Sequence, residues 1–327
     1  MKSHSLLWVL LWFGLVGTAR AAPLELEAKI PLGEVRGRID HLAVDIRRQR
    51  LFVAELGNDS VGVVDLNGRK ILRTLTGLKQ PQGIGYVPST DTLYIANAGD
   101  GSVRLFQGEN LAAIGQLALG EDADNVRVDD AAHRVFVGYG DGALAVIDTA
   151  SRHKIADIPL HAHPESFQLE RSGAQIMVNV PDSREIATVD RLTNKQLASV
   201  PTSDLRANFP LALDELHRRI VAVFRSPAKV GAFRMQDGHL LTTADTCGDA
   251  DDVFVDEKRN RLYVSCGEGF IDVLAAQGGG YVSIGRIPTA AGARTSLFIS
   301  SIDRFVLAVR ATGTIPAAVW VFRPETL

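Results

Sequence analysis

The sequence contains little cysteine and few recognisable catalytic motifs. Its 327 residues include two cysteines, Cys247 and Cys266. No Cys-x-x-Cys-His motif occurs, which excludes covalent attachment of a c-type haem. The sequence also lacks a Gly-x-Ser-x-Gly elbow and a phosphate-binding glycine loop, so no local motif supports nucleophilic serine or cysteine catalysis. The sequence therefore assigns no catalytic residue.

No apolar run has the length of a membrane span. The stretch Leu6–Val16 covers 11 residues, whereas a helix that crosses a bilayer needs about 20. Lys2 precedes this stretch and Ala19-Arg20-Ala21 follows it, which is the pattern of a secretory signal peptide. We expect residues 1–21 to be a cleaved signal peptide rather than a membrane anchor. Residues 22–327 are then expected in the periplasm or outside the cell, with no membrane span after cleavage.

An excess of positive charge is absent too. Without Lys2 and Arg20, the chain carries 33 basic and 38 acidic side chains, a net charge near −5. This balance argues against nucleic acid or an anionic membrane surface as a partner.

A repeat of short strands extends over residues 22–327. Each unit has a short apolar strand, a tight polar turn and a second strand ending near Gly or Asn. The first strands are centred on residues that recur every 41 to 44 positions: Leu42, Ile84, Val126, Phe167, Leu211, Val253 and Leu297. Strand-like alternation with a fixed period near 42 residues is typical of propeller blades. The sequence predicts an all-β, seven-bladed β-propeller in which 22–327 form a single domain.

The last repeat unit lacks its fourth strand. It ends at Phe322 after a third strand, whereas the segment 24–32 near the other end has the pattern of a fourth strand. We expect this mature N-terminal segment to pair with 319–322 and close the ring. Closure would remove the exposed sheet edges that an open array would leave.

Three segments carry a family resemblance. DTLYIANAGDGSV (91–103), RLYVSCGEGFIDV (261–273) and RLFVAELGNDSVGVVD (50–65) resemble the YVTN-type propeller repeat of YncE-like periplasmic proteins. The resemblance implies a seven-bladed ring and an extracytoplasmic location, and it implies no particular reaction. Only Trp320 remains after residue 21, too few tryptophans for the blade motifs of quinoprotein dehydrogenase propellers.

Polar side chains precede the first strand of each unit. Because the innermost strands of a propeller line its central channel, these residues are expected at one mouth of the channel. The candidate ligand-binding set is Asp40, His41, Gln82, Asp124, Asn125, Glu165, Asn208, Asp251, Asp252 and Arg294. Two interpretations remain open. The residues either cap strand ends and hydrate the channel, or form a binding site with perturbed pKa values.

Histidines and carboxylates near this mouth suggest a divalent cation as the one candidate cofactor. His161 and His163 face one side of an extended segment that continues to Glu165. The candidate metal ligands are His161, His163, Glu165 and Asp251. In the alternative interpretation, the histidines lie on a solvated loop.

The two cysteines fall around the sixth unit. Cys247 precedes its first strand and Cys266 ends its second strand. An even number of cysteines in an exported protein favours a disulfide. Two buried free thiols are the alternative.

Three functional hypotheses follow. The first is a propeller that binds a small molecule or an envelope protein at the polar mouth. The second is a metal-dependent hydrolase or lyase, such as a lactonase, in which Asp40, His41, Glu165 or Asp251 serves as ligand or base and Arg294 holds an anionic group. The third is a structural assembly factor of the envelope.

Overall fold

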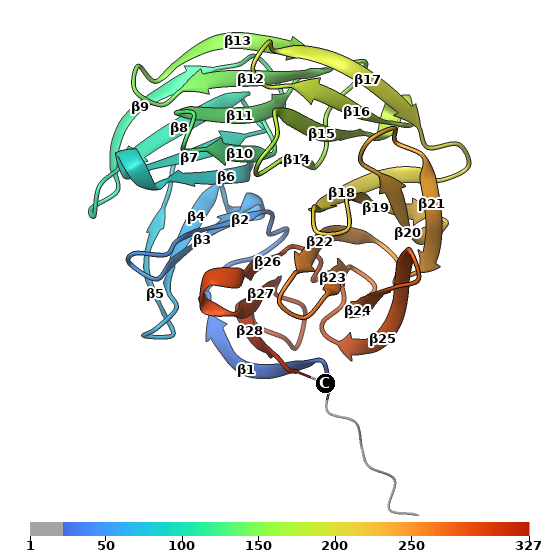
Figure 1. Ribbon diagram of the computed structural model, residues 1–327. Helices are drawn as coiled ribbons and strands as arrows, with labels where there is room; N and C mark the ends of the chain where they lie inside the picture. The colour runs from blue at the N-terminus through green and yellow to red at the C-terminus, as the bar shows by residue number, and fades with distance from the viewer. Residues whose placement is uncertain (1–21, 327) are drawn as a thin grey trace, which may run out of the picture.

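The chain folds into a ring of small β-sheets (Figure 1). The computed structural model describes residues 22–326, and the expected signal peptide, 1–21, lies outside this range. Within residues 22–326, 28 strands form seven four-stranded sheets. The prediction of a seven-bladed β-propeller is therefore confirmed. No helix in this part of the chain is long and apolar enough to cross a membrane.

The strands of each blade follow one another outward from the channel. Blade 1 has β2 (Leu42–Asp45), β3 (Arg50–Glu55), β4 (Ser60–Asp65) and β5 (Lys70–Leu75). Blade 2 has β6 (Pro81–Val87), β7 (Thr92–Asn97), β8 (Ser102–Gln107) and β9 (Ala112–Ala118). Blade 3 has β10 (Val126–Asp129), β11 (Arg134–Tyr139), β12 (Ala143–Asp148) and β13 (His153–Pro159).

The next three blades repeat this order. Blade 4 has β14 (Phe167–Leu169), β15 (Gln175–Val180), β16 (Glu185–Asp190) and β17 (Lys195–Pro201). Blade 5 has β18 (Arg206–Asp214), β19 (Arg219–Ser226), β20 (Ala228–Arg234) and β21 (Leu240–Asp245). Blade 6 has β22 (Ala250–Asp256), β23 (Arg261–Cys266), β24 (Phe270–Gln277) and β25 (Gly280–Pro288).

Blade 7 combines strands from both ends of the described chain. It has β26 (Ser296–Ile299), β27 (Arg304–Val309), β28 (Ala318–Pro324) and, as its outer strand, β1 (Leu24–Pro31). β1 and β28 are antiparallel, with a register from Leu24 opposite Pro324 to Pro31 opposite Ala318. Short 3-10 turns lie beside four strands: η1 (Leu56–Asn58), η2 (Pro88–Thr90), η3 (Pro181–Ser183) and η4 (Ser300–Ile302).

The hydrophobic core lies between neighbouring blades rather than inside one blade. Both faces of a middle strand are covered by adjacent sheets, so all residues of β23 are buried. Tyr263 of this strand packs against Phe298 and Phe305 of blade 7, with ring centroids 5.3 and 5.4 Å apart. Burial of such large side chains contributes about 2 kcal/mol each to the stability of the ring.

A buried ion-pair cluster joins blades 6 and 7. Arg259 donates to Asp256 at the end of β22 (3.0 Å) and to Asp303 of the next blade (2.7 Å). The Tyr263 hydroxyl also donates to Asp256, at 2.6 Å. Asp303 ends η4 with a φ of 54°, a left-handed conformation that short polar residues tolerate. Arg48 likewise bridges Asp45 of blade 1 and Asp91 of blade 2, but there the Tyr86 hydroxyl donates to Asp91.

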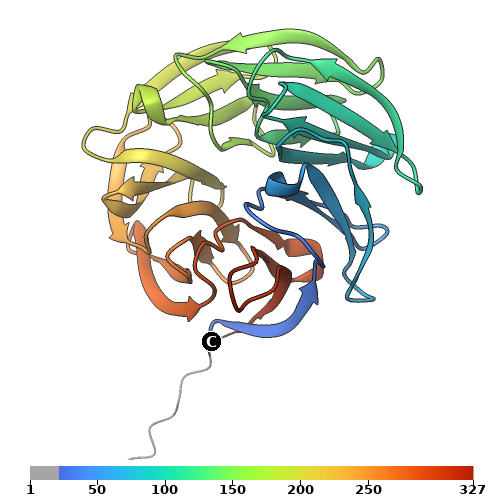
Figure 2. The ribbon, with the colours of Figure 1, turned by 180° about the vertical axis from the view of Figure 1, so that it is seen from behind.

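The first strands of all blades run in the same direction along the channel. Their N-terminal ends therefore meet at one mouth of the channel and their C-terminal ends at the other. Figure 2 shows the ring from the opposite side to Figure 1, with the blades again around the central channel. The fold thus offers two chemically separate surfaces at the centre of the ring.

Candidate functional site

A polar cavity of about 250 Å³ lies at the N-terminal ends of the inner strands. It is lined by Arg38, Asp40, His41, Gln82, Asp122, Asp124, Asn125, His163, Glu165, Ser166, Phe209, Arg225, Asp251 and Arg294. Nearly every side chain in this lining can form hydrogen bonds or carries charge. The cavity therefore suits a small polar ligand more than an apolar one.

A repeated pattern of backbone hydrogen bonds holds the polar residues at the same level along the channel axis in several blades. In blade 1, the Asp40 N–H donates to the Ala54 carbonyl (2.7 Å), and the Ala54 N–H donates to the His41 carbonyl (3.1 Å). Blade 3 repeats the pattern with Asp124, Gly138 and Asn125, and blade 4 with Glu165, Asn179 and Ser166. The residues before each inner strand are thus fixed by the end of the second strand, which turns their side chains toward the cavity.

Three arginines neutralise part of the acidic lining. Arg38 lies 2.8 Å from Asp40. Arg225 contacts Asp251 at 2.5 Å, and Arg294 contacts the same carboxylate at 3.2 Å. Arg225 also stacks on Phe209, with its guanidinium carbon 3.9 Å from the ring centroid. These pairs leave Asp40 and Asp251 with cationic partners.

His41 lies at the centre of the acidic lining. Its Nε2 is 3.7 Å from Asp40 and 3.9 Å from Asp124, and its Nδ1 is 4.0 Å from Asp252. Burial, together with the positive charge of Arg127, lowers the pKa of His41 to about 4. His41 is therefore neutral at physiological pH and does not compensate the neighbouring carboxylates.

Three carboxyl groups of the lining, those of Asp122, Asp124 and Glu165, have no arginine partner within residues 22–326. Asp124 is only 7% exposed, and its Oδ1 has no hydrogen-bond partner among the described residues. Burial and the nearby carboxylates of Asp40 and Glu165 raise the pKa of Asp124 well above its usual range. Burial likewise raises the pKa of Glu165 to about 7. An unpaired buried carboxyl is costly, which makes Asp124 the strongest indication of a ligand at this cavity.

Most residues of the predicted set line the polar cavity. Asn208 and Asp252 do not. Asn208 is fully buried and donates to Asn179 Oδ1 and to the Glu185 carbonyl, both at 3.0 Å, so it joins blades 4 and 5. Asp252 lies beside His41 and accepts the Ser296 N–H at 2.7 Å. Its burial raises its pKa well above the usual range.

Several residues of the lining were missed by sequence reasoning. They are Asp122, Ser166, Phe209 and Arg225. Arg225 is near the end of a second strand, β19, and not before a first strand. The turns after second strands reach the same mouth as the crossovers, and this relation could have identified Arg225. Its long side chain reaches across to the Ala250 carbonyl (2.8 Å) at the start of blade 6.

The proposed metal ligands are not assembled as a set. His161 bonds through Nδ1 to Glu185 at 2.8 Å, away from the lining of the polar cavity. His163 bonds through Nδ1 to the Gly140 carbonyl at 2.6 Å, which occupies that nitrogen. Within residues 22–326, no group of three or more His, Cys, Asp or Glu side chains is arranged to hold a metal ion. Glu165 and Asp251 line the polar cavity, but they do not share it with His161.

The two cysteines lie next to each other in blade 6. Cys266 is opposite Ala250 in the register of β22 and β23, and the segment before β22 brings Cys247 back toward it. Their Cα atoms are 5.8 Å apart, and the two sulfurs form a disulfide. This link fixes the segment that carries Asp251 into the polar cavity.

The ring and its central cavity define a class, the seven-bladed β-propellers. Three solved structures share this fold. A chain of the hydrazine synthase of Kuenenia stuttgartiensis is 15% identical, with 90% of this chain and 98% of that chain covered and a TM-score of 0.77. A chain of a mitotic checkpoint complex is 11% identical over 98% of this chain and 99% of its own, with a TM-score of 0.79. The RRP9 WD40 repeats are 11% identical over 93% of this chain and 99% of their own, also with a TM-score of 0.79.

These likenesses show the fold alone, because the identities are low. No family model matches the chain. No curated protein matches it either. Propellers of this kind commonly mediate the binding of ligands or proteins. The function of this chain must therefore be argued from the chemistry of its central cavity.

Proposed function

We propose that the protein binds a small organic ammonium compound in the polar cavity. The observation that carries the proposal is Asp124, a buried residue of the lining whose Oδ1 has no hydrogen-bond partner among the described residues. A ligand ammonium group would supply the missing hydrogen-bond donor and the missing positive charge together.

The charge balance of the lining supports a cation. Arg38, Arg225 and Arg294 are engaged by protein carboxylates. Glu165, like Asp124, has no arginine within ion-pair distance in the described chain, and Asp122 at the rim adds a further acidic group. The side of the cavity formed by blades 3 and 4 therefore has carboxyl groups without an ion-pair partner, whereas the arginines opposite are already paired with protein carboxylates.

The volume restricts the ligand to a small molecule. Pockets for drug-sized ligands span roughly 300 to 1,000 Å³, whereas this cavity measures about 250 Å³. A short aliphatic amine or diamine fits this volume, and a folded peptide segment does not.

Ligand binding is expected to release protons. Glu165, with a pKa of about 7, is partly protonated at neutral pH in the free protein. A bound ammonium group favours the ionised carboxylate, lowers this pKa and expels the proton. Affinity should therefore fall as the pH drops below about 7, because protons compete with the ligand for the same carboxyl groups.

Isothermal titration calorimetry with putrescine tests the proposal. The control ligand is the uncharged diol of the same chain length, which forms hydrogen bonds but has no ammonium group. We expect saturable binding of putrescine, a measured heat that changes between buffers of different ionisation enthalpy, and no binding of the diol. Asp124→Asn should weaken putrescine binding by roughly tenfold or more. Equal binding of the diol, or an unchanged affinity of Asp124→Asn, would overturn the proposal.

The geometry of the described residues does not favour a metal-dependent hydrolase or lyase. Such a reaction needs a cluster of ligands, and the described residues contain no arrangement of three or more suitable side chains. Glu165 has a pKa suited to proton transfer near neutral pH. No residue of the lining is placed as its nucleophile or oxyanion partner.

We also propose, from the sequence, that the protein is exported and is a relative of the YVTN-type propellers. The Cys247–Cys266 disulfide supports export, because such links persist in oxidising compartments. N-terminal sequencing of the protein purified from its own host tests this proposal. A mature chain beginning at Ala22 would support it, and a retained Met1 would refute it.

A further inference from the structure

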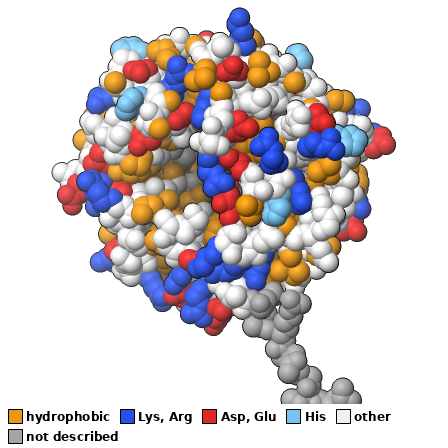
Figure 3. Space-filling model, viewed as in Figure 1, with side chains coloured by type: hydrophobic (Ala, Val, Ile, Leu, Met, Phe, Trp, Pro, Cys, Tyr) orange, Lys and Arg blue, Asp and Glu red, His pale blue; other side chains and the backbone are white. Residues whose placement is uncertain are grey.

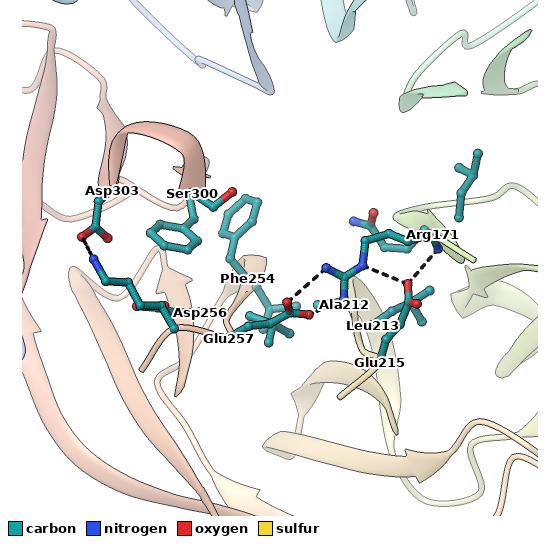
Figure 4. Close-up of a pocket in the computed structure, with 15 residues that line it drawn as sticks. Arg171, Ala212, Leu213, Glu215, Phe254, Asp256, Glu257, Ser300 and Asp303 are labelled. Carbon is teal, nitrogen blue, oxygen red and sulfur yellow. Dashed lines mark hydrogen bonds and ion pairs between the residues drawn. The ribbon is translucent and has the colours of Figure 1, made fainter. Parts of the chain in front are cut away.

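A second cavity lies at the opposite mouth of the channel, where the inner strands of blades 4 to 7 end. We call it the apolar cavity because seven of its fifteen lining residues are apolar, compared with Phe209 alone in the polar cavity. Its volume is about 430 Å³. The apolar residues include Leu169, Leu213, Val253, Phe254, Val255 and Phe298, and the other eight lining residues are polar or charged. Figure 4 shows these walls between the end of blade 7 and Arg171 of blade 4. The volume is within the range of small-molecule sites, about 300 to 1,000 Å³.

The aromatic walls are held in place from behind. Phe254 packs edge-on against Phe305, with ring centroids 6.1 Å apart, and Phe298 packs in the same way against Tyr263 at 5.3 Å. Phe254 and Phe298 are only partly buried, although the rings behind them are fully buried. Two preorganised phenyl rings that remain accessible provide a surface for a planar apolar group.

The walls also present hydrogen-bonding groups of the backbone. β22 is the innermost strand of blade 6 and pairs only with β23. Its other edge faces the channel, and an unpaired strand edge has a row of free N–H and C=O groups. A ligand that lies along β22 can therefore form hydrogen bonds in addition to apolar contacts.

The charged groups around the apolar cavity form ion pairs with one another. The Arg171 backbone N–H and side chain bond to Glu215 (2.8 Å for the N–H), and its guanidinium also bonds to Glu257. Lys258 bonds to Asp303 at 2.7 Å. These bonds join blades 4, 5 and 6 on one side and blades 6 and 7 on the other (Figure 4). The rim therefore offers no unpaired charge to a ligand.

The face seen in Figure 3 is hollowed at its centre. Hydrophobic side chains lie in the wall of the hollow, and basic and acidic side chains alternate beside it. This surface differs in kind from the polar cavity, where unpaired carboxyl groups predominate. The two ends of the channel are thus suited to different ligands.

We infer that the apolar cavity is a second binding site, for an uncharged small molecule with at least one aromatic ring and a hydrogen-bonding group at its edge. The phenyl walls select the ring, the free edge of β22 recognises the polar edge group, and the internally paired rim disfavours a net charge. This site is independent of the ammonium site in the polar cavity.

Fluorescence titration with N-phenylnaphthylamine tests the inference. This probe is uncharged and has two aromatic ring systems joined by one N–H donor, and its emission rises in apolar surroundings. Ser300 lies at the rim of the apolar cavity and is exposed, whereas its neighbour Ser301 is exposed on the same turn, η4, but does not line the cavity. Ser300→Trp should block the site, and Ser301→Trp is the matched control.

We expect saturable binding of one probe molecule, loss of at least roughly tenfold in affinity for Ser300→Trp, and unchanged affinity for Ser301→Trp. Phe254→Ala should weaken binding by a similar factor. The circular dichroism spectrum of this variant shows whether the propeller has folded. Putrescine should not displace the probe. Wild-type affinity in Ser300→Trp, an equal loss in Ser301→Trp, or no saturable binding would overturn the inference.

Discussion

Replacing Glu165 with glutamine should stabilise the protein at alkaline pH and leave its stability unchanged in acid. Burial raises the pKa of Glu165 from 4.5 to about 7, and the negative charges of Asp251 and Asp40 add to the effect. The folded state therefore holds a proton that the unfolded chain has already lost. Between about pH 4.5 and pH 7, the free energy of unfolding falls as the pH rises.

The size of the effect follows from the two pKa values. They differ by about 2.5, and each unit corresponds to about 1.4 kcal/mol, so ionised Glu165 lowers the free energy of unfolding by about 3 kcal/mol above pH 7. Glutamine has nearly the same shape and no charge. Glu165→Gln should thus match the wild type near pH 4 and exceed it by up to about 3 kcal/mol near pH 8.

Guanidinium denaturation followed by circular dichroism, at both pH values, measures this difference. Glu121→Gln is the control, because Glu121 is exposed near the same mouth and the same chemical change should have little effect there. A variant that is less stable than the wild type at pH 8 would refute the reasoning. So would a stabilisation of equal size at both pH values, since it could not come from the charge.

Two further predictions concern the structure around blade 6. Arg259→Met should lower the free energy of unfolding by about 3 kcal/mol near neutral pH, because it leaves the buried Asp256 carboxylate without its cation. Hydrogen bonds from Arg259 lower the pKa of Asp303, so this ion pair contributes stability that is lost in strong acid. The loss of stability in the variant should therefore shrink below about pH 3. Thermal unfolding across pH measures both effects, and an equal loss at every pH would contradict the ion-pair explanation. Reduction of the Cys247–Cys266 disulfide, which closes a loop with a sequence separation of 19, should lower the stability by about 3 kcal/mol. Denaturation with and without reductant measures this loss, and coincident curves with full reduction verified by thiol titration would contradict it.

The architecture could be predicted from the sequence because the same strand and turn pattern occurs in each repeat unit. The strands around Leu42 and Val253, for example, are preceded by equivalent crossovers and followed by equivalent turns. Each repeat unit therefore supports the strand assignment of the others. The inner-strand positions also follow from this order, which explains why Asp40, Asp124 and Glu165 line one cavity.

The contacts within the site could not be predicted in the same way. Asn208 occupies the equivalent position of its repeat unit, although it lies within β18, and its short side chain turns to Asn179 in the neighbouring blade. Arg225 lies outside the predicted set and still reaches Asp251. These outcomes depend on side-chain length and rotamer, which a repeat pattern does not specify. The apolar cavity was missed for another reason: Phe254 and Phe298 alternate like ordinary core residues, and nothing in the sequence indicates that they remain accessible.

The pairing of β1 with β28 has a consequence for how the molecule is made. β1 leaves the ribosome first, but its partner, Ala318–Pro324, is made last. The first strand must therefore wait unpaired through nearly the whole of synthesis, and its docking is a contact of very high sequence separation, the kind that forms slowly. Until then, the outer edge of β28 is open to any other extended chain. Blade 7 is thus the place where two copies could exchange β1 strands during assembly. The ring is completed correctly when β1 of the same chain pairs with β28 before a strand of another chain does.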